Sequence, residues 1–137
     1  MAHIIIADDD ELVTRLVQDT LHEYGHKVGA VPDAYALLEA IELKHPDLVI
    51  LDCSMPGNGI LALREIRQSP TFFKLPVVML TGRRSESDVG IALREGATAY
   101  VKKPFDPHHL AFRIEEILEK AAGDSPAAAA PPPLKFK

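Results

Sequence analysis

The chain has 137 residues, of which 47% are hydrophobic and 26% are charged, and its net charge at pH 7 is −5. This length suits one domain with a hydrophobic core, and the acidic balance argues against nucleic-acid binding by this segment. We find no apolar run long enough to cross a membrane and no secretory signal peptide, so a cytoplasmic protein is expected. The single cysteine, Cys53, excludes an internal disulfide.

Short apolar runs alternate with amphipathic segments in the first part of the chain. The β-branched run His3–Ala7 predicts a buried strand, and Asp10 is placed to cap the helix that follows and stops at Gly25. Lys27–Val31 predicts a second strand, and the next amphipathic helix ends before Pro46.

The middle of the chain contains its most apolar stretch, which ends in a carboxylate. Leu48–Asp52 is aliphatic until its last residue and predicts a strand buried on both faces. By itself, Asp52 is as well explained by the end of a strand as by a chemical role. Met55–Gly59 has the composition of a loop, and Leu61–Gln68 predicts a third helix.

Two further strand and helix pairs complete the pattern. Pro76–Leu80 predicts a buried strand that is followed by Thr81 and Gly82. Ser85–Glu95 predicts a helix that the interior residue Gly90 weakens by about 1 kcal/mol. Ala99–Lys102 predicts a fifth strand, and a last amphipathic helix follows it.

The alternation of five strands and five helices predicts the fold class. Short connections between alternating elements favour an α/β fold with a five-stranded parallel sheet and helices on both faces. We assign residues 1–122 to this domain. Residues 123–137 are rich in alanine and proline, and are expected to form a flexible tail or a linker.

Polar residues gather where the predicted strands end. Asp8 and Asp9 follow the first strand, Asp52 ends the third, Thr81 follows the fourth and Lys103 follows the fifth. The carboxyl ends of parallel strands meet at one edge of a sheet, where ligands bind. Three carboxylates there repel one another, and Mg²⁺ relieves that repulsion. The lysine and the hydroxyl suit phosphoryl oxygens, so the set indicates phosphoryl transfer to Asp52 as a nucleophile.

Each of these residues also has a plain structural interpretation. Asp8 and Asp9 could cap a helix, Thr81 could end a strand, and Lys103 could be an ordinary surface lysine. Their joint occurrence at successive strand ends is what favours a common site.

These residues give the chain a resemblance to a known family, the receiver domain of two-component response regulators. The resemblance extends over roughly residues 3–122. The motifs that carry it are Asp8-Asp9, Asp52 followed by Met55-Pro56, Thr81-Gly82 and Lys103-Pro104-Phe105.

The resemblance implies a flavodoxin-like, doubly wound (βα)5 fold and a signalling switch rather than an enzyme in the usual sense. It implies that Asp52 accepts a phosphoryl group from a histidine kinase or a phosphotransfer protein. It also implies a Mg²⁺ site made by Asp9, Asp52 and the main-chain carbonyl of Ser54, with Asp8 acting through water.

The same resemblance assigns the residues that would respond to phosphorylation. Lys103 would pair with the Asp52 carboxylate and later with the phosphoryl group, and the bond between Lys103 and Pro104 would be cis. Thr81 would close onto the phosphoryl group, and Tyr100 would turn inward with it. The face made by the fourth helix, the fifth strand and the fifth helix would then bind a downstream protein, an output domain or a second copy of the chain.

The sequence departs from the family pattern after Asp52. The loop that follows Met55-Pro56 reaches its glycine, Gly59, one residue early, so it is shortened by one. Ser54 and Arg83 flank the hydrolytic path in this family and should affect the lifetime of the phosphorylated state, in a direction that the sequence leaves open.

Two alternatives to a phosphorylated switch remain. A haloacid dehalogenase-type phosphohydrolase also combines a nucleophilic aspartate, a hydroxyl and a lysine. Its nucleophile lies on the first strand with a second aspartate two residues on, whereas the residue two past Asp52 is Ser54. A receiver-like adaptor that signals by binding alone is disfavoured by the complete set of site residues.

Overall fold

The computed structural model describes residues 1–53, 55–82 and 86–123. Within these residues five strands and five helices alternate along the chain. The strands are β1 (His3–Ala7), β2 (Lys27–Val31), β3 (Leu48–Asp52), β4 (Val77–Thr81) and β5 (Ala99–Lys102). The helices are α1 (Glu11–Glu23), α2 (Ala34–Lys44), α3 (Gly59–Gln68), α4 (Glu86–Arg94) and α5 (Pro107–Gly123).

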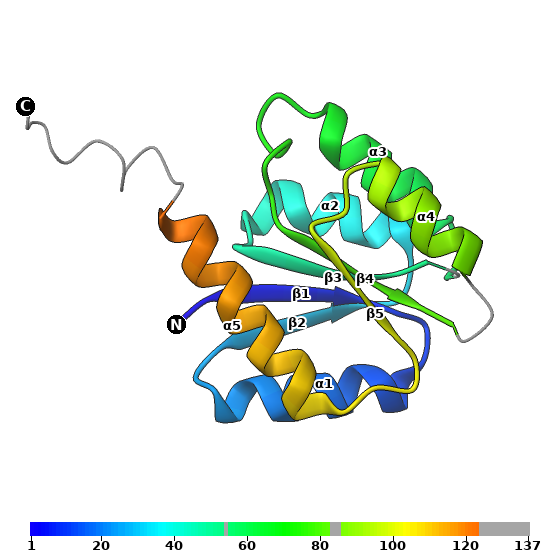
Figure 1. Cartoon of the computed structure of the whole chain (residues 1–137). Coiled ribbons are helices and arrows are strands. Elements are labelled where there is room, and N and C mark those ends of the chain that lie inside the picture. Colours follow the sequence, from blue (N-terminus) through cyan, green and yellow to red (C-terminus); the bar gives the residue numbers. More distant parts are fainter. Residues whose placement is uncertain (54, 83–85, 124–137) are drawn as a thin grey trace, which may run out of the picture.

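All the strand pairs of the described residues are parallel, in the order β2-β1-β3-β4-β5 (Figure 1). This order confirms the predicted doubly wound α/β fold. The chain starts at β1, next to one edge of the sheet, forms that edge with β2, returns past β1 to β3 and then proceeds to the other edge. The strand order therefore reverses next to β1, and ligands of such sheets bind at this switch point.

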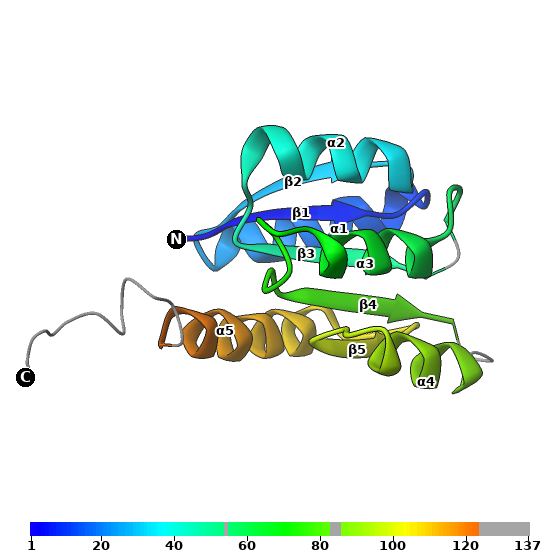
Figure 2. The ribbon, with the colours of Figure 1, turned by 90° about the horizontal axis from the view of Figure 1, so that it is seen from above.

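The helices cover both faces of the sheet (Figures 1 and 2). On one face, α1 and α5 pack through residues such as Val17 and Ile114 against Ile4 and Ile6 of β1. On the other face, α2, α3 and α4 pack against the side chains of alternate residues of the same strands. All five residues of β3 are buried, as expected for a central strand.

Local signals in the sequence set the beginnings and ends of several helices as predicted. The Asp10 side chain accepts hydrogen bonds from the main-chain N–H groups of Leu12 and Val13 and caps α1. Gly25 follows α1 with φ of +88°, a conformation that glycine adopts without strain. Among the described residues, we find no helix with the length and apolar character needed to span a membrane.

Several element boundaries differ from the prediction, and among them α4 ends at Arg94 rather than Glu95 and α5 includes Gly123. α3 begins at Gly59 rather than Leu61, because the Asn58 side chain accepts from the main chain of Ile60 and caps the helix early. β4 runs from Val77 to Thr81, one residue later than predicted, so that Thr81 is its last residue. Residues 124–137, which form most of the predicted tail, lie outside the described residues.

Candidate functional site

Three carboxylates meet at the carboxyl end of the sheet. β1 and β3 are neighbours in register, with Ala7 opposite Leu51, so the residues that follow them come together. Carboxylate oxygens of Asp8, Asp9 and Asp52 all lie within 4.8 Å of one another. Asp8 and Asp52 are buried, whereas Asp9 is exposed to solvent. The cluster therefore has a buried floor and an open side from which a ligand can approach.

Lys103 brings a positive charge to this cluster from the end of β5. Its Nζ lies 2.9 Å from Oδ2 of Asp8 and 3.5 Å from Oδ2 of Asp52. Burial lowers the pKa of Lys103, but the hydrogen bond to Asp8 and the charge of Asp52 outweigh this effect, so the pKa is raised overall. The ammonium group stays charged at neutral pH, and its shorter contact is with Asp8 rather than with Asp52.

The pKa of Asp8 is raised, chiefly because the carboxylate is buried. The negative charge of Asp52 adds to this effect. The hydrogen bonds from the Asp10 N–H and from Lys103 oppose it but do not cancel it. The three clustered carboxylates favour additional positive charge, and oxygen ligands of this kind suit a hard divalent cation such as Mg²⁺.

Thr81 contributes an unused hydroxyl at the end of β4. The residue is fully buried, and its Oγ1 has no hydrogen-bond partner among the described residues. A buried hydroxyl without a partner costs free energy, and this one is available to a ligand oxygen at the same edge of the sheet. The β5 end is tied to Thr81 by a main-chain hydrogen bond of 2.7 Å from Lys103 N–H to the Thr81 carbonyl.

Not every sequence-predicted residue lies at this cluster. The expected cis bond between Lys103 and Pro104 is confirmed. Tyr100 lies on the outer side of β5 with 40% of its surface exposed, so it has not turned inward in this structure. Ser54 and Arg83 lie outside the described residues.

Two features beside the site were missed by sequence reasoning. Gly59 packs directly against the main chain of Asp52, and the only signal for it was the shortened loop. A shallow apolar groove next to Lys103 is lined by Val13, Leu16, Pro104 and Phe105. Its residues come from α1 and from the β5–α5 connection, and no local pattern relates these two segments.

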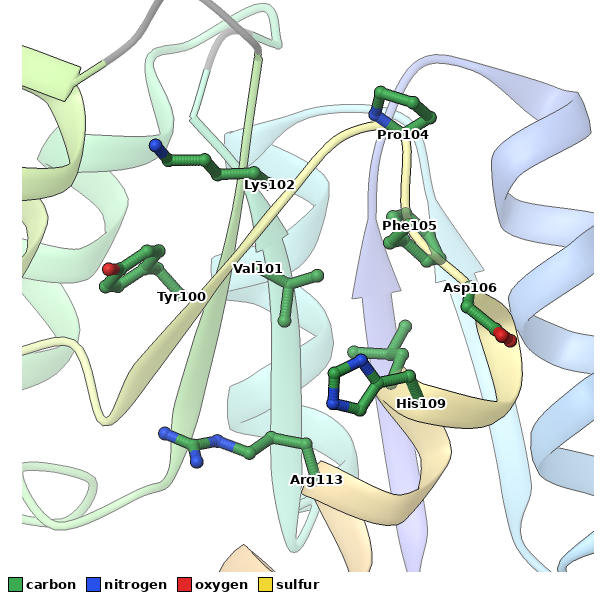
Figure 3. A pocket seen from close by; sticks show the side chains of 9 residues that line it. Tyr100, Val101, Lys102, Pro104, Phe105, Asp106, His109 and Arg113 are labelled. Atoms are coloured by element: carbon green, nitrogen blue, oxygen red, sulfur yellow. The ribbon is translucent and has the colours of Figure 1, made fainter.

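A second hollow lies on the other side of the β5–α5 connection (Figure 3). It has a volume of about 490 Å³ and contains Tyr100 and Lys102 of β5 and His109 and Arg113 of α5. Tyr100, Lys102 and Arg113 point to the same side of the hollow, whereas Asp106 lies apart from them (Figure 3). Lys102 and Lys103 are successive residues, so this hollow and the carboxylate cluster share one short stretch of chain.

The sequence of this chain is similar to a known protein family and to several characterised proteins. A family model described as the response regulator receiver domain matches residues 4–115. The transcriptional regulatory protein CseB of Streptomyces avermitilis is 37% identical over 119 residues, which are 86% of this chain and 49% of that protein. The alkaline phosphatase synthesis transcriptional regulatory protein PhoP of Bacillus subtilis is 32% identical over 91% of this chain and 52% of its own length.

Solved structures agree with the sequence comparisons. The chemotaxis response regulator CheY4 of Vibrio cholerae superposes with a TM-score of 0.80 at 26% identity. That comparison covers 85% of this chain and 98% of the other. The chain thus spans about half the length of the curated relatives it matches, and nearly all of this solved structure.

Proposed function

Since this chain belongs to the receiver domain family of two-component response regulators, we propose that Asp52 is its phosphoryl acceptor. The observation that supports this most directly is the position of Asp52 itself. It is the last residue of a fully buried strand, and it lies with Asp8 and Asp9 beside the ammonium group of Lys103. The donor is a phosphohistidine of a histidine kinase or of a phosphotransfer protein.

The reaction needs a nucleophile, charge neutralisation and donors for phosphoryl oxygens. A carboxylate oxygen of Asp52 attacks phosphorus, and the phosphorus–nitrogen bond breaks. The electron pair of that bond goes to the leaving imidazole nitrogen, which then takes up a proton. Lys103 neutralises charge on the transferred group, and the buried hydroxyl of Thr81 donates a hydrogen bond to one of its oxygens.

Mg²⁺ is the cofactor that we propose for this reaction. Asp9 and Asp52 would hold it directly and Asp8 through water, together with the main-chain carbonyl of Ser54, which lies outside the described residues. The ion neutralises the carboxylates and the incoming phosphoryl oxygens when it is bound. The three carboxylates, whose oxygens lie within 4.8 Å of one another, support this assignment.

The groove beside Lys103 fits a protein donor better than a small one. Leu16 of α1 is 44% exposed, and Leu12 on the same helix is 80% exposed. Leu16 lines the groove from α1 together with Val13, and Pro104 and Phe105 line it from the β5–α5 connection. An apolar surface of this kind next to a reactive carboxylate can hold a partner while its phosphohistidine reaches Asp52.

We propose that α4, β5 and α5 form the face that changes on phosphorylation and binds the downstream partner. Phosphorylation draws Thr81 toward the phosphoryl group, and Tyr100 moves from its exposed position toward the space that Thr81 vacates. The hollow of Figure 3 lies on this face and would change shape with Tyr100. A downstream protein, an output domain or a second copy of the chain would bind there. We propose a cytoplasmic location, because the histidine kinase needs ATP.

Phosphorylation by acetyl phosphate tests the acceptor and the cofactor together. The wild-type chain and Asp52→Asn are incubated with acetyl phosphate, with and without Mg²⁺, and a gel that retards phosphoproteins separates the products. We expect one phosphoryl group on the wild type, which is labile to base and stable to mild acid as an acyl phosphate is. Asp52→Asn and the sample without Mg²⁺ should remain unlabelled.

The experiment has two outcomes that contradict the proposal. Equal labelling of the wild type and of Asp52→Asn would exclude Asp52 as the acceptor. Equal labelling with and without Mg²⁺ would exclude a role of the ion in the transfer.

A further inference from the structure

We propose that Gly59 is a positioning residue for the nucleophile, because it fixes the main chain of Asp52 at the position that phosphoryl transfer requires. This inference rests on the proposed role of Asp52 as the acceptor. Gly59 is the first residue of α3 and lies against the main chain of Asp52, so its proposed effect on the reaction passes through Asp52.

The contact between Gly59 and Asp52 leaves no room for a side chain. A Cβ atom at position 59 would overlap the carbonyl oxygen of Asp52. It would also lie 3.1 Å from the carbonyl carbon of Asp52 and 3.0 Å from Cα of Cys53. All three atoms belong to the main chain at the end of β3, so no side-chain rotation can relieve the overlap.

Hydrogen bonds hold Cys53, the residue that follows Asp52, through both of its main-chain polar groups. The Cys53 N–H donates to the Leu80 carbonyl at 3.0 Å, which ties the Asp52–Cys53 peptide to β4. The Gly59 N–H donates to the Cys53 carbonyl at 3.2 Å, which ties Cys53 to α3. The Asn58 side chain caps α3 through Ile60 N–H at 2.9 Å and fixes where the helix starts. The end of β3 is therefore held by hydrogen bonds to β4 on one side and to the first turn of α3 on the other.

A methyl group at position 59 must push the first turn of α3 and the end of β3 apart. Because both segments are held by hydrogen bonds, both are displaced, and the Asp52 carbonyl shifts. The Asp52 side chain leaves the main chain one bond from that carbonyl, and its Oδ2 is already 3.5 Å from Nζ of Lys103. A misplacement of about 1 Å in a reacting group can lower a rate about 100-fold.

Gly57 supplies a control of the same kind in the same loop. Its φ is +89°, and a Cβ there would lie 2.8 Å from Cβ of Ala34 and 3.2 Å from the Tyr35 ring. Gly57→Ala is therefore strained and destabilising, but its strain falls on the start of α2 and not on Asp52. Comparing it with Gly59→Ala separates a loss of stability from a displacement of the nucleophile.

The test measures the initial rate of phosphorylation against acetyl phosphate concentration for the wild type, Gly57→Ala and Gly59→Ala. Mg²⁺ is kept saturating, and circular dichroism reports the folded fraction of each sample. Trimethylamine oxide is added to all samples if either variant is partly unfolded, and rates are expressed per folded molecule.

We expect both variants to melt at lower temperature than the wild type. Gly59→Ala should lose at least 10-fold in the maximal rate, with the half-saturating acetyl phosphate concentration unchanged within about twofold. Gly57→Ala should keep the maximal rate of the wild type within about twofold. This split between rate and affinity is not expected of a residue that only supports the fold.

Other results would overturn the inference. A maximal rate of Gly59→Ala equal to that of Gly57→Ala, per folded molecule, would show that α3 moves and Asp52 does not. Absence of labelling of the wild type would overturn the proposed function, and this inference with it.

Discussion

The hydroxyl of Thr81 is buried at the end of β4 without a hydrogen-bond partner among the described residues. A buried polar group in this state costs about 1–3 kcal/mol, whereas an apolar group of the same shape does not. The whole Thr81 side chain, its methyl group included, is shielded from solvent. This cost is consistent with the proposal that the Thr81 hydroxyl binds a phosphoryl oxygen when Asp52 is phosphorylated.

Thr81→Val should therefore stabilise the unphosphorylated protein while it impairs the switch. We expect the free energy of unfolding to rise by about 1–2 kcal/mol in urea denaturation without Mg²⁺ or phosphodonor. Thr98→Val is the matched control, because the Thr98 hydroxyl accepts hydrogen bonds from the Val77 N–H and from Arg67. That variant should lose stability. A loss of stability in Thr81→Val would contradict our interpretation of its hydroxyl.

At the scale of elements, α3 holds the end of α4 through two arginines. Arg67 is half-buried, and burial lowers its pKa. Its guanidinium donates to the carbonyls of Gly96 and Leu75, each at 2.7 Å, and of Phe73 at 3.1 Å. Arg64 makes an ion pair with Glu95 at the surface, with an N–O distance of 2.8 Å. The connection from α4 to β5 is thereby tied to α3 and to the α3–β4 connection.

Arg67→Lys should cost about 2 kcal/mol of unfolding free energy, because one ammonium group cannot replace the planar set of donors that reaches two connections. Arg64→Lys, at the exposed pair one turn away, should cost much less, because solvent screens that ion pair. Urea denaturation of both variants measures this difference. Equal losses would mean that the carbonyl contacts of Arg67 do not hold these connections together.

The boundaries of elements show where local sequence signals suffice. Asp10 was predicted as a cap because its side chain needs only the next three residues, and the structure confirms it. The start of α3 was placed two residues late, because Gly57 and Gly59 indicate a loop when they are considered alone. Glycine is needed at position 57 because the main chain lies against Ala34, and at position 59 because it lies against Asp52. Both partners are distant in sequence.

At the scale of the whole molecule, the carboxylate cluster and the proposed output face are joined by β5 and the residues that follow it. Lys103 reaches Asp8 and Asp52, whereas Tyr100 and Lys102 border the hollow on the other side (Figure 3). A change at the site can thus reach the face over a few residues, and Tyr100 is the side chain that should report it.

Phosphorylation should change the environment of Tyr100 and leave the other two tyrosines unaffected. The chain is labelled with 3-fluorotyrosine, and fluorine NMR spectra are recorded before and after treatment with acetyl phosphate and Mg²⁺. We expect the Tyr100 resonance to shift as its side chain becomes buried. Tyr35, which is 75% exposed on α2, and Tyr24 next to His108 are internal controls. An unchanged Tyr100 resonance in fully phosphorylated protein would contradict the proposed route.

The sequence alone determined the alternation of elements, the parallel sheet and the residues at the strand ends. Periodicity and capping depend on neighbours in the chain, and parallel strands bring their carboxyl ends to one edge whatever their order. Only the tertiary structure decided that β1 lies beside β3. It also decided that Lys103 makes its shorter contact with Asp8, that the Thr81 hydroxyl lacks a partner among the described residues, and that Gly59 rests on the Asp52 carbonyl. These facts depend on atoms brought together from distant parts of the chain, at distances that no local pattern encodes.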